Sequence, residues 1–166
     1  MRLQIRLPQV LTGVAVAGLA AVGAAVATQA FLGMLPCPWC VFQRLMYVLV
    51  AVLALLAAWG PKAGRLPLIG LALVADAWGL GAALWQQFYA SKSPSCDMTL
   101  ADRVVSGLKL DGLFPDVFMA LASCADATVP LLGVSYAAWS ALLFTALGAT
   151  LVWALRFVLR ARRRWA

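Results

Sequence analysis

Four cysteines are the residues of this chain whose type and spacing could do chemistry. Two of them form the motif Cys37-Pro-Trp-Cys40, and the other two stand alone at Cys96 and Cys124. A cysteine thiolate can attack a disulfide, and it can also ligate a metal. Three chemistries are therefore open: thiol–disulfide exchange, two structural disulfides, or a zinc site with four cysteine ligands.

The spacing favours exchange over the two structural options. A ring closed by Cys37 and Cys40 would remove only about 2 kcal/mol of unfolded-state entropy, against roughly 3.6 kcal/mol for a ring from Cys96 to Cys124. A weak crosslink in a tight ring suggests a reactive bond. A zinc site normally has a second C-x2–4-C pair, which the sequence lacks. We therefore predict a redox role and no metal, with structural disulfides as the alternative.

The elements that must position these cysteines are membrane helices. Of the 166 residues, 64% are apolar and 11% are charged, whereas about a quarter of a soluble domain is charged. Apolar runs at 10–32, 41–59, 67–89 and 135–155 each approach the ~20 residues that cross a bilayer, and they do not alternate as barrel strands do. We predict an all-α integral membrane four-helix bundle that forms one domain over residues 1–166.

The basic residues predict the orientation of the bundle. With four crossings, nine of the thirteen Lys and Arg residues share one side: Arg2, Arg6, Lys62, Arg65, Arg156, Arg160, Arg162, Arg163 and Arg164. The positive-inside rule then places both termini in the cytosol and the segments 33–40 and 90–134 in the periplasm of a bacterial inner membrane. All four cysteines fall on this oxidising side. The basic tail is expected to contact lipid and no nucleic acid.

Two segments allow a second interpretation. The first apolar run resembles a cleavable signal peptide, but it is much longer than the ~7–15 apolar residues of such a peptide, so we expect a retained helix. Apolar residues recur at helical spacing over 98–110 with charged residues among them, which predicts a short amphipathic helix. It would lie on the membrane surface or pack on the bundle.

Cys40 has two features that would stabilise a thiolate. It lies at the N-terminal edge of the helix predicted for 41–59, where free N–H groups and the helix dipole favour an anion. Arg44 lies four residues on, one turn along the same face. A charged residue just inside a membrane span indicates a functional site. The alternative for Arg44 is that its side chain extends to the lipid headgroups.

With these motifs in this order, the sequence resembles the DsbB family of bacterial disulfide-bond oxidoreductases over nearly its whole length. The resemblance rests on the four spans and on short motifs: Cys37-Pro-Trp-Cys40 with Gln43-Arg44, Ser93-Pro-Ser-Cys96-Asp97, Phe114-Pro-Asp-Val-Phe118 before Cys124-Ala125, Leu132-Gly-Val-Ser135, and Trp139-Ser140. It implies an enzyme that forms disulfide bonds with ubiquinone or menaquinone as electron acceptor. It also implies a DsbA-like periplasmic partner of thioredoxin fold.

The resemblance implies a role for each site residue. Cys96 would be attacked by the reduced partner, and Cys124 would be its companion in the resting disulfide. Once released, Cys124 would attack Cys37, leaving Cys40 as the thiolate that faces the quinone. Arg44 would lie beside both the quinone and that thiolate.

The chain departs from the family at one position near the quinone. Some members carry a His on the third helix, where this chain has about Ala83 and contains no His at all. Arg44 would then be the main polar anchor, with Gln86 or Gln87 as substitutes or as interfacial residues. Asp76 falls in mid-membrane, where we expect a protonated or hydrogen-bonded carboxyl.

Two other functions fit parts of the sequence. One is a vitamin K epoxide reductase-like oxidoreductase, which also combines a helical bundle, a C-x-x-C motif and a quinone. The other is a tetraspan protein without enzymatic activity, held by two structural disulfides. The placement of Cys37-Pro-Trp-Cys40 before the second span, with Arg44 four residues on, favours the DsbB-like function over both.

Overall fold

The computed structural model describes residues 7–92, 99–125, 130, 131 and 133–163. Its main elements are four long helices: α1 (Leu7–Leu32), α2 (Pro38–Trp59), α3 (Arg65–Phe88) and α7 (Tyr136–Arg163). All four are long and apolar enough to cross a membrane. The predicted all-α four-helix membrane bundle is therefore confirmed. The bounds of α1, α2 and α3 lie within three residues of the predicted ones, whereas α7 continues to Arg163, well beyond the predicted end at 155.

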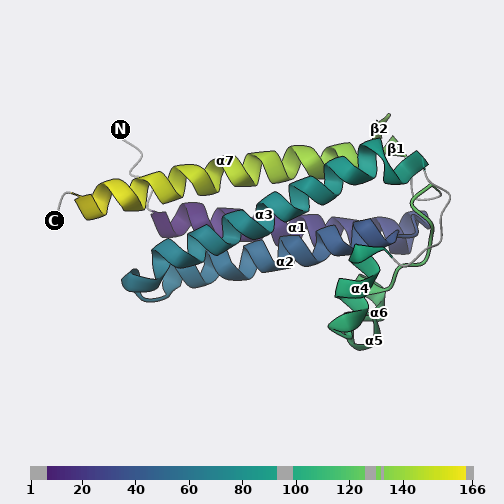
Figure 1. The fold of residues 1–166 in the computed structure, drawn as a ribbon, viewed down its shortest axis with the longest axis horizontal. Helices are drawn as coiled ribbons and strands as arrows, with labels where there is room; N and C mark the ends of the chain where they lie inside the picture. The colour runs from purple at the N-terminus through teal and green to yellow at the C-terminus, as the bar shows by residue number, and fades with distance from the viewer. Residues whose placement is uncertain (1–6, 93–98, 126–129, 132, 164–166) are drawn as a thin grey trace.

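The four helices run alongside one another as a long bundle (Figure 1). The start of α1, the turn between α2 and α3, and the end of α7 lie at one end. That turn holds the short 3-10 helix η1 (Lys62–Gly64). The connection from α1 to α2 and the segments between α3 and α7 lie at the other end (Figure 1), so the motif residues Cys37 and Cys40 lie at the end opposite η1.

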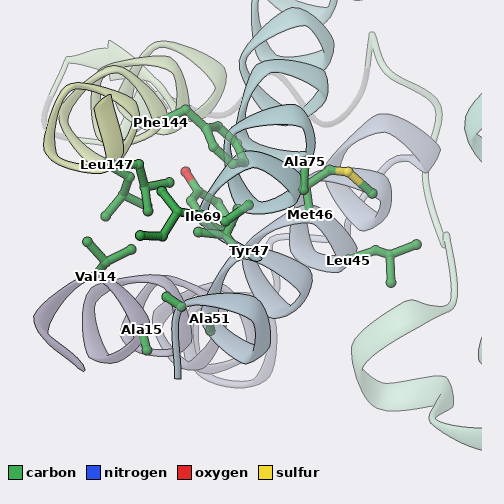
Figure 2. Close-up of a cluster of buried hydrophobic side chains, with 14 of the residues drawn as sticks. Val14, Ala15, Leu45, Met46, Tyr47, Ala51, Ile69, Ala75, Phe144 and Leu147 are labelled. Carbon is green, nitrogen blue, oxygen red and sulfur yellow. The ribbon is translucent and has the colours of Figure 1, made fainter. Parts of the chain in front are cut away.

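Packing at the centre of the bundle depends on aromatic rings and small residues. The rings of Tyr47 and Phe144 stack with centroids 4.0 Å apart, which joins α2 to α7. Ile69 of α3 and Ala51 of α2 are fully buried in the same cluster (Figure 2). Large apolar side chains instead point outward on the surface of the long helices, as Trp78 does with 58% exposed. An apolar outer surface of this kind suits a lipid environment.

The segment between α3 and α7 contains several short elements. They are η2 (Ala90–Lys92), α4 (Leu100–Gly107), α5 (Leu110–Leu113), α6 (Pro115–Phe118), β1 (Pro130–Leu131) and β2 (Val134–Ser135). The two strands pair antiparallel. Helices α4 to α6 gather beside α2 at one end of the bundle (Figure 1).

The amphipathic helix predicted for 98–110 is shorter in the structure. Helix α4 begins at Leu100 because Thr99 caps it, accepting a hydrogen bond from the N–H of Asp102, whose carboxylate accepts in return from the N–H of Thr99. It ends at Gly107. Ala101 and Val105 are buried in the hydrophobic core, so this helix packs on the bundle. Met98 lies outside the described residues.

Candidate functional site

Cys37 and Cys40 lie at the beginning of α2. The helix begins at Pro38 rather than at the predicted Val41. A proline suits the first position of a helix because the N–H that it lacks would have no partner within the helix there. Cys37 caps the helix, and its sulfur accepts a hydrogen bond of 3.4 Å from the N–H of Cys40. The two sulfur atoms are 2.9 Å apart, so the two thiols lie in direct contact.

Cys124 approaches the same place from the segment after α6. Its thiol forms a hydrogen bond with the thiol of Cys37. The N–H groups of Leu121 and Ala122 both donate to the carbonyl of Pro36, at 2.9 and 3.2 Å. These two bonds fix the segment before Cys124 to the chain just before Cys37. Cys124 therefore lies beside the Cys37-Pro-Trp-Cys40 motif, although it is distant from it in the sequence.

The hydrogen bond between Cys37 and Cys124 affects the two thiols in opposite directions. It raises the pKa of Cys37 far above the usual value, and a hydrogen bond to Cys40 and burial act in the same direction. It lowers the pKa of Cys124, as does a hydrogen bond to the backbone of Trp39, although burial opposes them. The thiolate form is therefore favoured at Cys124 and disfavoured at Cys37. The fourth cysteine, Cys96, lies outside the described residues.

Arg44 is buried inside the bundle, nearly two turns into α2. Its guanidinium donates to the side-chain oxygen of Gln29 and to the carbonyl of Val117, both at 2.9 Å. It also donates to the carbonyl of Ala25 at 3.3 Å. The side chain is 5% exposed, which contradicts the alternative that it extends to the headgroups. Arg44 instead connects α1 and α2 to α6.

A cavity of about 550 Å³ lies between α1, α2 and α7 beside this arginine. Most of its wall is apolar, and a few polar groups converge on it, as is usual for sites that bind small molecules. Cys40 is the one cysteine among its lining residues in the described chain. The polar or titratable side chains of the wall are Thr28, Cys40, Gln43, Arg44, Tyr47, Tyr136 and Ser140.

Two glutamines contact the Cys40 site in different ways. Gln86 of α3 donates from its side-chain nitrogen to the sulfur of Cys40 at 3.1 Å. Gln43 of α2 donates to the side-chain oxygen of Gln86 at 2.7 Å. Gln87 is instead the acceptor of a hydrogen bond from Ser135. The contact between Gln86 and Cys40 could not be predicted from the sequence. A polar residue such as Gln86 in an apolar span did indicate a functional position there.

Four further residues extend the comparison with the sequence prediction. The hydroxyl of Tyr47 pairs with that of Ser140 at 2.9 Å in the cavity wall, and sequence reasoning missed this pair. Asp76 is buried in α3, and its Oδ1 has no hydrogen-bond partner within the described residues. Ala83, where some DsbB-like chains carry His, is fully buried.

The chain matches a known family model and several curated proteins. The family model "Disulfide bond formation protein DsbB" matches residues 8–154. The chain is similar to Disulfide bond formation protein B of Dechloromonas aromatica (strain RCB), with 37% identity over 80% of this chain and 81% of the relative. It is also similar to Disulfide bond formation protein B 1 of Pseudomonas savastanoi pv. phaseolicola (strain 1448A / Race 6), with 34% identity over 88% and 86%.

No solved structure matches the chain at a significant level. The assignment therefore rests on the family model, on the relatives, and on a C-x-x-C motif at the start of the second of four membrane helices. Together these show that the chain belongs to the DsbB family of disulfide bond formation proteins.

Proposed function

We propose that this disulfide-forming oxidoreductase reoxidises a DsbA-like periplasmic protein of thioredoxin fold and delivers the electrons to a membrane quinone. The observation that carries the proposal is the succession of three sulfur atoms. Cys124 contacts Cys37, the sulfur of Cys37 lies 2.9 Å from that of Cys40, and Cys40 lines the cavity. Electrons entering at Cys124 would leave at the cavity wall.

Each thiol–disulfide exchange in the relay breaks one disulfide bond and forms another. The partner's dithiol reduces the disulfide between Cys96 and Cys124 and becomes a disulfide itself. The thiolate of Cys124 attacks the sulfur of Cys37, so that a bond between Cys124 and Cys37 forms, the bond between Cys37 and Cys40 breaks, and its electron pair moves to Cys40. Attack of Cys96 on Cys124 restores the first disulfide and leaves Cys37 and Cys40 reduced.

The residues around Cys40 suit ubiquinone or menaquinone as the acceptor. A quinone would take two electrons and two protons from the reduced pair of Cys37 and Cys40. The mostly apolar cavity between α1, α2 and α7 suits a ring dissolved in the membrane, and Arg44 at its wall supplies a fixed positive charge. Its three hydrogen bonds hold the guanidinium in place.

The orientation belongs to the same proposal. Both termini would lie in the cytosol and the cysteines in the periplasm of a bacterial inner membrane. The turn between α2 and α3 carries Lys62 and Arg65, and the last turns of α7 carry Arg156 and Arg160. These cations gather at the end opposite the cysteines (Figure 1), which supports that orientation.

The test uses purified protein in detergent with a reduced thioredoxin-fold substrate and ubiquinone, and follows quinone absorbance. Wild type should consume quinone only when the dithiol substrate is present. Cys40→Ser should abolish consumption because the leaving thiolate is gone, and Cys96→Ser should abolish it by removing the entry point. Consumption that persists in either variant contradicts the relay. Inert disulfides in wild type would instead indicate a non-enzymatic membrane protein.

A further inference from the structure

Gln86 is the buried side chain that directly contacts the sulfur of Cys40 from another helix. It lies near the end of α3 and is 2% exposed. Its side-chain nitrogen donates to the Cys40 sulfur at 3.1 Å. A buried amide needs partners for both of its polar atoms, and here the nitrogen meets a sulfur that changes charge during the reaction.

Gln43 fixes the orientation of that amide. Its own side-chain nitrogen donates to the oxygen of Gln86 at 2.7 Å, and the residue is 3% exposed. If the amide of Gln86 turned over, its NH2 group would face the NH2 group of Gln43, donor against donor. The contact with Gln43 therefore keeps the N–H of Gln86 directed at Cys40.

The two glutamines differ in their position relative to the cavity. Gln43 belongs to the cavity wall, and Gln86 does not. Gln86 is thus placed to act on the sulfur rather than on a molecule in the cavity. A hydrogen bond to an ionised acceptor is roughly twice as strong as one to a neutral acceptor, so this donor favours the thiolate over the thiol.

We infer that Gln86 is a further catalytic residue of the relay, which stabilises Cys40 as the leaving thiolate, and that Gln43 is a positioning residue that orients it. The inference rests on the proposed function and adds one step to it. As Cys124 bonds to Cys37 and the bond between Cys37 and Cys40 breaks, the electron pair arrives on the sulfur that already accepts from Gln86. No proton moves in this step.

The first experiment measures the reactivity of Cys40 without a partner or a quinone. The full chain in detergent is reduced and treated with iodoacetamide over a range of pH, and modification of Cys40 is followed by peptide mass. In Gln86→Met the pH of half-maximal reaction should rise, and the rate at neutral pH should fall roughly tenfold to a hundredfold, as expected for loss of one hydrogen bond to a charged group.

Gln87→Met is the matched control, since it makes the same replacement at the next residue of α3, whose side chain contacts Ser135. Its Cys40 profile should match that of wild type. Gln86→Asn, a shorter amide that cannot reach the sulfur equally well, should change the profile in the same direction as Gln86→Met and provides a second variant if the first fails to fold. An unchanged profile in a folded Gln86 variant overturns the inference.

Turnover then separates this inference from the proposed function. In Gln86→Met the kcat for quinone reduction should fall while the quinone KM stays near the wild-type value, because Gln86 does not line the cavity. A raised KM with unchanged kcat would overturn the inference and make Gln86 a quinone ligand. If wild type reduces no quinone although Gln86→Met shifts the Cys40 profile, the proposed function fails and the contact with the thiolate stands.

Discussion

At the scale of single residues, the described spans contain few polar side chains, and most of them are paired across helices. The hydroxyl of Tyr47 is paired with Ser140, and Gln43 with Gln86. Arg44 donates to two backbone carbonyls and one side chain. An unsatisfied polar group in hydrocarbon costs several kcal/mol, so these pairs both connect helices and hold the groups around Cys40 in fixed positions.

The pKa of Cys124 is lowered and that of Cys37 is raised, which leads to a prediction about thiol labelling. In the fully reduced protein at neutral pH, Cys124 should react with iodoacetamide well before Cys37. The shared hydrogen bond lowers the pKa of Cys124 and raises that of Cys37, and Cys37 is also fully buried. Peptide mass spectrometry after timed quenching measures the rate at which each of the two cysteines is labelled. Raising the pH should narrow the difference between the labelling rates of the two cysteines. Faster labelling of Cys37 than of Cys124 would contradict this arrangement of the two thiols.

At the scale of the elements, α3 and α7 approach closely because each has a glycine where it meets a side chain of the other helix. Gly79 packs against Phe144, and a Cβ built at Gly79 would lie 2.3 Å from two carbons of that ring. Gly148 of α7 similarly leaves room for the carboxyl of Asp76. Close approach through small residues is a common way for membrane helices to associate.

Gly79→Val should therefore destabilise the bundle. The added side chain would have to displace the Phe144 ring, which also stacks on Tyr47, and overpacking of this kind costs about 1–3 kcal/mol. The measurement is the thermal unfolding temperature in detergent. Gly81→Val is the control, because nothing lies within 4 Å of a Cβ at Gly81. Equal unfolding temperatures for the two variants would contradict this packing.

At the scale of the whole molecule, the described cysteines lie at one end of the bundle, and most of the described Lys and Arg residues outside the segment between α3 and α7 lie at the other. The cysteines at the start of α2 and after α6 lie far from the turn that holds η1 (Figure 1). Helices α4 to α6 are joined to the bundle both by the core residues of α4 and by the hydrogen bond from Arg44 to Val117. The segment that carries Cys124 is therefore anchored beside Cys37.

The orientation predicts which positions a membrane-impermeant maleimide can reach. In a background without the native cysteines, Ser106→Cys in α4 should be labelled in intact spheroplasts, and Lys62→Cys in η1 should not. Both residues are exposed, so both should react after lysis, which is the control. Labelling of Lys62→Cys alone in spheroplasts would reverse the proposed topology.

Much of this protein could be predicted from sequence because it depends on local composition. The four spans follow from apolar runs long enough to cross a bilayer. The distribution of Lys and Arg predicts an orientation for them, which stays a proposal. The motif Cys37-Pro-Trp-Cys40 and its place before the second span gave the redox hypothesis. The start of α2 at Pro38 could also have been read from proline chemistry.

Only the tertiary structure decided which groups meet. The rotation of each helix about its axis places Gln86, rather than Gln87, against Cys40, and hydropathy does not specify that rotation. Contact between Cys124 and Cys37 depends on how a long segment folds back, here through hydrogen bonds to the carbonyl of Pro36. Composition thus determines that helices form and are apolar enough to cross a membrane, and side-chain packing determines which of their residues touch the sulfur of Cys40.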